Sequence, residues 1–166
     1  RQKYQFNIEP LVQLGRLEFV DLVGTRVKRA DALGKLTGLR FLDVSRTKVD
    51  SIGKLKNLTA LTHLKMNHTF VRDLRGLDQM ESLEQLEIAW TRVKDLKDVG
   101  AATTLKSLKL DGTPIVDLEP IYKLKRLRRL SLWQTGVTRE KLAALRKENP
   151  HLKVSGCDGD SEHPCR

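Results

Sequence analysis

A repeat of constant length constrains the fold of this chain more than any other feature. Threonine recurs at intervals of 22 residues, at Thr25, Thr47, Thr69, Thr91, Thr113 and Thr135. Around each threonine the frame L-x-x-[LV]-x-[LVIM]-x-x-T-x-[VI] returns without insertion or deletion, for example as LEFVDLVGTRV and LEQLEIAWTRV. A self-similar period of roughly 20 to 50 residues is typical of a solenoid, in which each repeat stacks on its neighbours.

The aliphatic positions of the frame predict one short strand in each repeat. In the first repeat these positions are Leu17, Val20, Leu22 and Val27. The middle two flank a variable residue, which is the period-two pattern of a strand. In the second half of the repeat, apolar residues recur at every third position, as at Ile52, Leu55 and Leu58, which favours short 3₁₀ or helical turns. We therefore expect an α/β repeat fold with a concave parallel β-sheet and short turns on the convex side.

The threonines stand at the turn after each predicted strand, where buried backbone groups need hydrogen-bond partners. One interpretation is that their hydroxyls supply these partners and stack into an internal ladder. The other is that threonine is only a small residue that favours extended structure at the strand end. We expect the ladder, because neither serine nor valine replaces threonine in any of the six repeats.

The frame resembles the leucine-rich repeat family, in the 22-residue class found in bacterial internalins and eukaryotic phosphatase-regulating proteins. Those proteins usually carry asparagine where this chain has threonine. The variant T-x-V-x-D-L, present as TFVRDL, TRVKDL and TPIVDL, resembles many bacterial repeat proteins and some from protozoan parasites. The resemblance covers nearly the whole chain. It implies a right-handed leucine-rich repeat solenoid and, for function, a binding scaffold.

The frame divides the chain into a truncated N-terminal half-repeat, six repeats of which the last has a helical return, and a C-terminal half-repeat cap with a polar tail, at 1–16, 17–148 and 149–166. NIEPLVQL in the first segment aligns with DLEPIYKL and should place Ile8, Leu11 and Leu14 in convex-side core positions. Because no polar cap is evident there and the chain begins with arginine, we expect further residues upstream.

The C-terminal segment departs from the frame and then rejoins it. Thr138 is the predicted N-cap of a helix that Pro150 ends, and Leu142 and Leu145 fall on one helix face. Strand positions resume at residues 152 and 154, and a cysteine follows 22 residues after the last threonine.

Two cysteines, Cys157 and Cys165, leave two hypotheses open. A disulfide between them would staple the tail and indicate a secreted or cell-surface protein; the alternative is two free thiols. A metal site formed with His163, Asp158 and Asp160 is disfavoured, since C-x7-C fits no zinc motif. We expect no metal and no cofactor.

Composition and motifs exclude several classes of function. No run of apolar residues is long enough for a membrane span. The chain contains no phosphate-binding glycine loop, no H-E-x-x-H and no G-x-S-x-G, so we expect no enzymatic activity. The net charge of +10 suits acidic partners, although Lys and Arg spread through every repeat also suit a solvated, repulsive surface.

The variable residues between the strand aliphatics should face the concave side and bind a partner. The predicted partner-binding residues, chosen as aromatic or charged and outside the core positions, are Phe19, Phe41, His63, Lys65, Trp90, Lys106, Lys109, Arg128, Arg129 and Trp133. For the two phenylalanines the alternative is a stacked pair that covers the N-terminal edge. A separate basic ridge is expected along one edge, at Arg26, Lys28, Lys48, Arg72, Arg92 and Lys94.

These observations predict a non-enzymatic module that binds a protein partner on its concave face, with an acidic patch on the partner suited to the C-terminal cations. One alternative is a polyanion or nucleic-acid binder that uses those cations and the basic ridge. Nucleic acid is disfavoured because acidic concave residues repel phosphates and no nucleic-acid motif is present. A second alternative is a structural spacer in a larger surface protein. We expect a monomer or part of a larger chain.

Overall fold

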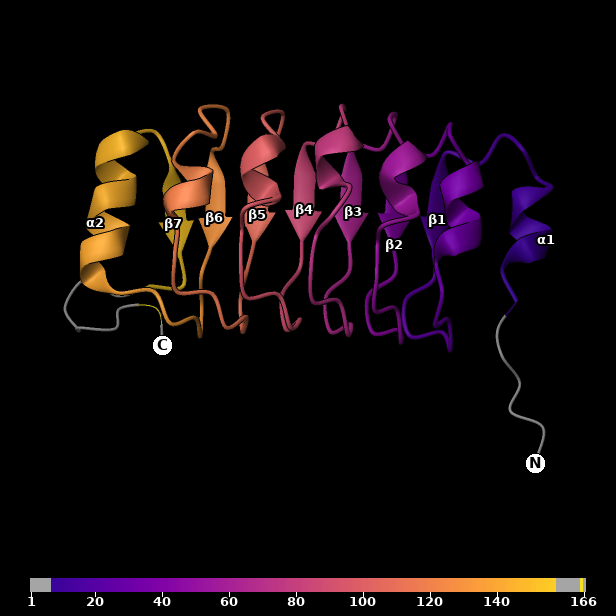
Figure 1. The fold of residues 1–166 in the computed structure, drawn as a ribbon, viewed down its shortest axis with the longest axis horizontal. Coiled ribbons are helices and arrows are strands. Elements are labelled where there is room, and N and C mark those ends of the chain that lie inside the picture. Colours follow the sequence, from indigo (N-terminus) through magenta and orange to yellow (C-terminus); the bar gives the residue numbers. More distant parts are fainter. Residues whose placement is uncertain (1–6, 158–164, 166) are drawn as a thin grey trace.

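The computed structural model describes residues 7–157 and 165, which form one seven-stranded parallel sheet in chain order (Figure 1). The strands are β1 (Phe19–Asp21), β2 (Phe41–Asp43), β3 (His63–Lys65), β4 (Gln85–Glu87), β5 (Ser107–Lys109), β6 (Arg129–Ser131) and β7 (Lys153–Ser155). From β1 to β6 each residue pairs with the residue 22 positions later, as Val20 does with Leu42. The repeat length therefore sets the register of the sheet.

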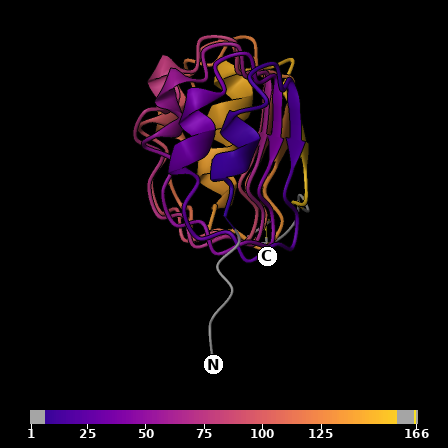
Figure 2. The same ribbon diagram turned by 90° about the vertical axis from the view of Figure 1, so that its right-hand side faces the viewer.

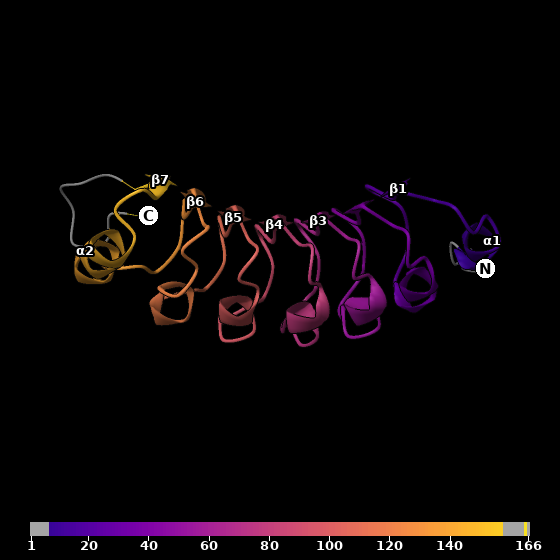
Figure 3. The same ribbon diagram turned by 90° about the horizontal axis from the view of Figure 1, so that it is seen from above.

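Short helices form the second layer, on the opposite side from the concave sheet (Figures 2 and 3). They are α1 (Glu9–Val12), the 3₁₀ helices η1 (Asp31–Lys35), η2 (Leu55–Asn57), η3 (Leu77–Gln79), η4 (Val99–Ala101) and η5 (Glu119–Ile121), and α2 (Arg139–Glu148). The predicted leucine-rich repeat solenoid, with its parallel sheet and short convex turns, is confirmed.

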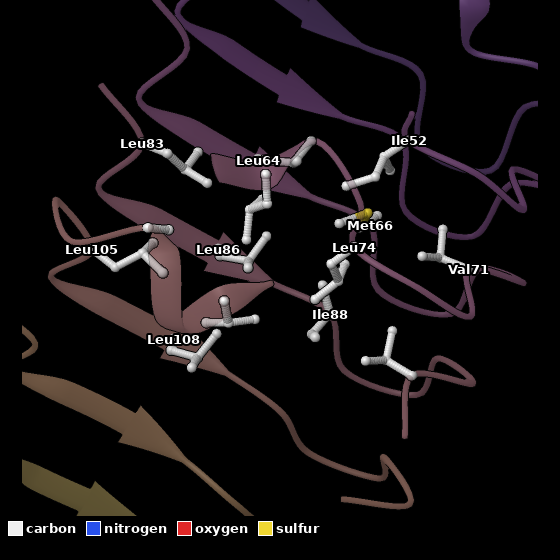
Figure 4. Close-up of a cluster of buried hydrophobic side chains, with 14 of the residues drawn as sticks. Ile52, Leu64, Met66, Val71, Leu74, Leu83, Leu86, Ile88, Leu105 and Leu108 are labelled. Carbon is white, nitrogen blue, oxygen red and sulfur yellow. The ribbon is translucent and has the colours of Figure 1, made fainter. Parts of the chain in front are cut away.

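The core is a continuous apolar column between the two layers. Equivalent residues of successive repeats stack there, as Leu64, Leu86 and Leu108 do beneath the sheet (Figure 4). On the convex side the predicted core residues Leu55 and Leu58 are fully buried. Each repeat therefore completes the apolar surface of the next, and the side chains on the concave face are not needed for the core.

The threonine hydroxyls act as predicted in satisfying backbone groups. All six donate to the carbonyl oxygen three residues earlier, at 2.5 to 2.8 Å, and the five from Thr47 onward are buried. Each of these bonds closes a turn within one repeat. Threonine is suited to this place because its short side chain brings the hydroxyl within reach of the carbonyl that follows the strand. At Thr25, Thr113 and Thr135 the backbone N–H of the same threonine donates to that carbonyl as well.

Hydrogen bonds from side chains to the next repeat come from a different position, two residues before the threonine. Ser45 Oγ accepts the Asn67 N–H at 3.0 Å, and Asn67 Oδ1 accepts the Ala89 N–H at 2.9 Å. Asp111 Oδ1 likewise accepts the Trp133 N–H at 2.9 Å. The sequence did not reveal this role, because the position varies from repeat to repeat.

The N-terminal end departs from the predicted packing. Ile8 is buried, but Leu14 is 59% exposed and Leu17 only partly buried, so the prediction of a core position for Leu14 is wrong. The chain turns at Gly15, which has a φ of +44°, and runs directly to β1. No described strand precedes α1, whereas β5 precedes the equivalent, buried Leu124 and completes its repeat.

The C-terminal end has the predicted helix and strand. Thr138 Oγ1 accepts the Lys141 N–H at 3.5 Å at the start of α2, and Leu142 and Leu145 are buried. Cys157 and Cys165 form a disulfide. The Cys165 side chain is fully buried, and its carbonyl oxygen accepts the Thr135 N–H at 2.8 Å.

The metal-site hypothesis for the tail involves Asp158, Asp160 and His163, which lie outside the described residues. Within 7–157 and 165, no group of three or more His, Cys, Asp or Glu residues is placed to hold a metal ion.

We expect Thr91→Val to lower the free energy of unfolding by about 1–3 kcal/mol, because the buried Ile88 carbonyl loses the 2.8 Å bond from the hydroxyl. Urea denaturation followed by circular dichroism measures the change. Thr103→Val, at an exposed position, is the matched control. Equal effects of the two substitutions would contradict a role for the buried hydroxyl.

The disulfide should be detectable by intact-mass measurement, with two alkylated thiols appearing only after reduction. Its removal in Cys165→Ala should lower the free energy of unfolding by about 2–3 kcal/mol, from the closed loop alone. Full alkylation of the native protein without reductant would show that the bond is absent.

Candidate interaction surface

A column of aromatic side chains stands on the concave face above β1 to β3. The strand pairing places Phe19, Phe41 and His63 side by side. The two phenylalanine rings stack with centroids 4.3 Å apart and planes 6° apart, and the His63 ring lies 6.0 Å from Phe41. Lys65 Nζ lies 5.8 Å from the centre of the Phe41 ring. Phe19 remains 61% exposed at the end of the stack.

Three of the predicted cations are partly neutralised by acidic neighbours. Lys65 Nζ is 3.2 Å from Glu87 Oε1 on the next strand, and Lys109 Nζ is 3.7 Å from Asp111 Oδ2. Lys106 Nζ lies 2.7 Å from Glu84 Oε1, and this hydrogen bond lowers the pKa of Glu84. These lysines therefore offer a partner less positive charge than their number indicates.

A basic pair on β6 and β7 is the least neutralised part of the concave face. Arg129 and Lys153 are register partners, so two like charges stand directly opposite each other. Within the described part of the chain neither forms an ion pair. The neighbouring Arg128 donates Nη1 to the carbonyl oxygens of Lys125 and Leu127, at 2.8 and 3.2 Å, so its charge also has no acidic partner there.

Lys153 was not among the residues predicted from the sequence. Helix α2 lengthens the last repeat, so Lys153 pairs with Arg129 across 24 residues rather than 22. The alternation of Leu152, Lys153 and Val154 was the available signal, because it places the lysine on the solvent side of a strand.

The two tryptophans form a second cluster, at the edge where the strands end. Trp90 and Trp133 occupy different positions in their repeats, yet their ring centroids lie 5.9 Å apart in an edge-to-face arrangement. The His68 ring stacks on Trp90 with centroids 5.8 Å apart. The indoles are 40% and 48% exposed. The predicted site residues thus form two aromatic clusters and a basic pair rather than one continuous patch.

Glycines of the next repeat make room for the Trp90 indole and for the backbone of Trp133. A Cβ atom on Gly112 would lie 2.4 Å from the Trp90 ring, and one on Gly156 would lie 2.7 Å from the Trp133 Cβ. Both glycines also have positive φ, +63° and +81°. The Trp90 indole consequently lies against the bare backbone of Gly112.

The turn itself explains why Trp90 projects from this edge. The residue before each threonine has positive φ, and glycine fills the position at Gly24 and Gly112. A non-glycine residue in this conformation costs about 1–2 kcal/mol. Trp90 therefore accepts a backbone penalty and still leaves much of its ring in solvent, a combination found at binding surfaces.

Comparison with solved structures places the fold among leucine-rich repeat proteins with a parallel sheet. An internalin (inlF) from Listeria monocytogenes superposes with a TM-score of 0.81 at 26% identity over 89% of this chain. Internalin C2 from the same species gives 0.79 at 22% over 90%, and a leucine-rich repeat protein from Leptospira interrogans gives 0.73 at 18% over 89%. The matches span 43%, 65% and 45% of those three chains.

No protein-family model and no curated protein sequence matches the chain. Among the described residues, no helix is both long and apolar enough to cross a membrane.

Gly112→Ala should displace the Trp90 indole, change the tryptophan fluorescence and destabilise the fold by more than the penalty for positive φ. Gly24→Ala is the matched control, since Gly24 has a φ of +70° and no atom within 4 Å of its added Cβ. The difference in free energy of unfolding between the two variants isolates the indole contact. Identical stability and fluorescence would show that Gly112 does not seat Trp90.

Proposed function

We propose that this chain is a non-enzymatic interaction module that binds a protein partner on its concave face. The observation that carries the proposal is the Phe19–Phe41 stack, which stands on the sheet and remains open to solvent above a core that is already complete. Exposed aromatic side chains on a rigid surface are favoured anchors for a protein partner, because they bury much area with little loss of conformational freedom.

The charges of the concave face support a defined orientation of the partner. Acidic residues gather at the N-terminal end, where Asp21 and Asp43 also accept backbone N–H groups two residues on. Cations gather at the C-terminal end around Arg129 and Lys153. A partner with an acidic patch facing β6 and β7 matches this gradient, and complementary charge favours one docking direction over its reverse.

The structural neighbours support the proposal at the level of the fold. They share a solenoid in which alternate side chains of each strand face the concave surface. A fold of this kind provides an extended concave surface suited to binding.

Site-specific photo-crosslinking tests the binding face. A photoreactive amino acid at Ser107, in the centre of the sheet, should give a protein adduct in an extract of the source organism. The same probe at Lys56, on the convex side, should not. Unlabelled chain should compete for the adduct. The competitor concentration that halves the adduct should rise about tenfold or more for Phe19→Ala/Phe41→Ala and for Arg129→Ala/Trp133→Ala.

Arg146→Ala/Lys147→Ala, on the exposed side of α2, is the control competitor and should match the unsubstituted chain. An adduct formed from Lys56 alone would place binding on the convex side. Full competition by both of these double variants would exclude Phe19, Phe41, Arg129 and Trp133 as anchors. The absence of any competable adduct would favour a structural spacer.

A further inference from the structure

The turn that follows each strand presents three positions to solvent. They lie one residue before the threonine, one residue after it and three residues after it. In the first four repeats these positions hold seven exposed cations, namely Arg26, Lys28, Arg46, Lys48, Arg72, Arg92 and Lys94. Asp50 is the single acid among the same positions. We call this strip, at the edge toward which the strand arrows point in Figure 1, the exit edge.

The cations of the exit edge are not used to hold the fold together. Ion pairs within the described residues involve lysines and arginines elsewhere, and none includes a cation of the exit edge. The acids nearest to it in sequence have other partners. Asp73 binds the Arg75 guanidinium at 2.9 and 3.2 Å, and Asp95 Oδ1 accepts the Lys97 N–H at 2.7 Å. The hydrogen bond from Arg75 lowers the pKa of Asp73, which keeps that carboxylate ionised and engaged.

The geometry of the exit edge is that of a linear array. Successive repeats advance by the spacing of parallel strands, about 4.8 Å, so cations recur at that interval along the solenoid. Between the third and fourth repeats lies a surface depression of about 530 Å³, lined by five cations and three acids, namely Arg72, Arg75, Arg92, Lys94, Lys97, Asp73, Asp95 and Asp98. The Arg92 guanidinium lies 4.9 Å above the Phe70 ring, which holds it in place.

We propose that the exit edge is a second binding site, distinct from the concave face, for an extended sulfated polysaccharide. Repeated unpaired cations suit a chain of repeated anions better than a single small anion, because each repeat adds a contact and releases a counterion. Arginine and lysine both donate hydrogen bonds to sulfate oxygens, and the depression beside Arg72 and Arg92 accepts one such group.

Two observations favour a polysaccharide over single-stranded nucleic acid. The Cys157–Cys165 disulfide indicates an oxidising compartment, where sulfated glycans are encountered. The rings of His68, Trp90 and Trp133 pack on one another and Trp90 packs on Gly112, while Phe70 lies beneath the Arg92 guanidinium, so the rings do not form a row of platforms for successive bases.

Heparin oligosaccharides of defined length, immobilised for surface plasmon resonance, provide the probe. We expect binding whose logarithmic affinity falls linearly with the logarithm of salt concentration. Arg72→Gln/Arg92→Gln/Lys94→Gln should reduce affinity about tenfold or more and lower that slope by roughly two to three. Lys35→Gln/Lys54→Gln/Lys123→Gln removes the same charge from exposed positions on or beside the convex helices, and should change affinity by less than about twofold. Circular dichroism confirms that both variants are folded.

Four results would overturn the proposal. These are equal losses in the two triple variants, no heparin binding at physiological salt, tighter binding of an oligothymidylate of equal charge, and binding abolished by Phe19→Ala/Phe41→Ala. The Phe19→Ala/Phe41→Ala variant also separates the two sites, because it alters the concave face and leaves the exit edge intact. The concave-face proposal can therefore fail while heparin binding at the exit edge is unchanged.

Discussion

The structure depends on satisfying the backbone at one turn, repeated along the chain. After each strand the chain leaves the sheet through a residue of positive φ, and the next residue is a threonine whose hydroxyl bonds the carbonyl of the residue just after the strand. In repeats one to five the N–H of the positive-φ residue then donates to a carbonyl of the following repeat, at 2.7 to 3.0 Å. One turn thus closes its own repeat and docks the next, and the sheet register follows from it.

This turn also separates positions that hold the fold together from positions that face solvent. The threonine and the aliphatic residues face inward, so the residues on either side of the threonine face solvent and are free to vary. His68 and Phe70, on the two sides of Thr69, are both exposed for this reason. The concave face has the same freedom, since Leu64 is buried while His63 and Lys65 point to the other side of the sheet. Two distinct surfaces therefore vary independently on one scaffold.

The sequence predicted the features that follow from period and alternation, and it missed those that depend on contact between unlike positions. The strand at Leu64, the convex core at Leu55 and the N-cap at Thr138 come from local patterns that the turn enforces. The proximity of Trp90 and Trp133 does not, because they lie at different places in their repeats and two repeats apart. Leu14 was misplaced because alignment with Leu124 carries no information about a missing neighbour.

Gly112 couples the placement of the Trp90 indole to the order of the repeats. Trp90 belongs to one repeat and Gly112, the residue that makes room for it, belongs to the next. Duplication, deletion or exchange of whole repeats keeps the frame and hence the fold. If such an event separates the repeat of Trp90 from the repeat of Gly112, however, the indole meets a different residue. Arg46 and Gln134, at the same position in other repeats, carry side chains that would occupy the space of the ring. The scaffold is modular, whereas the placement of Trp90 is kept only when its repeat and that of Gly112 stay adjacent.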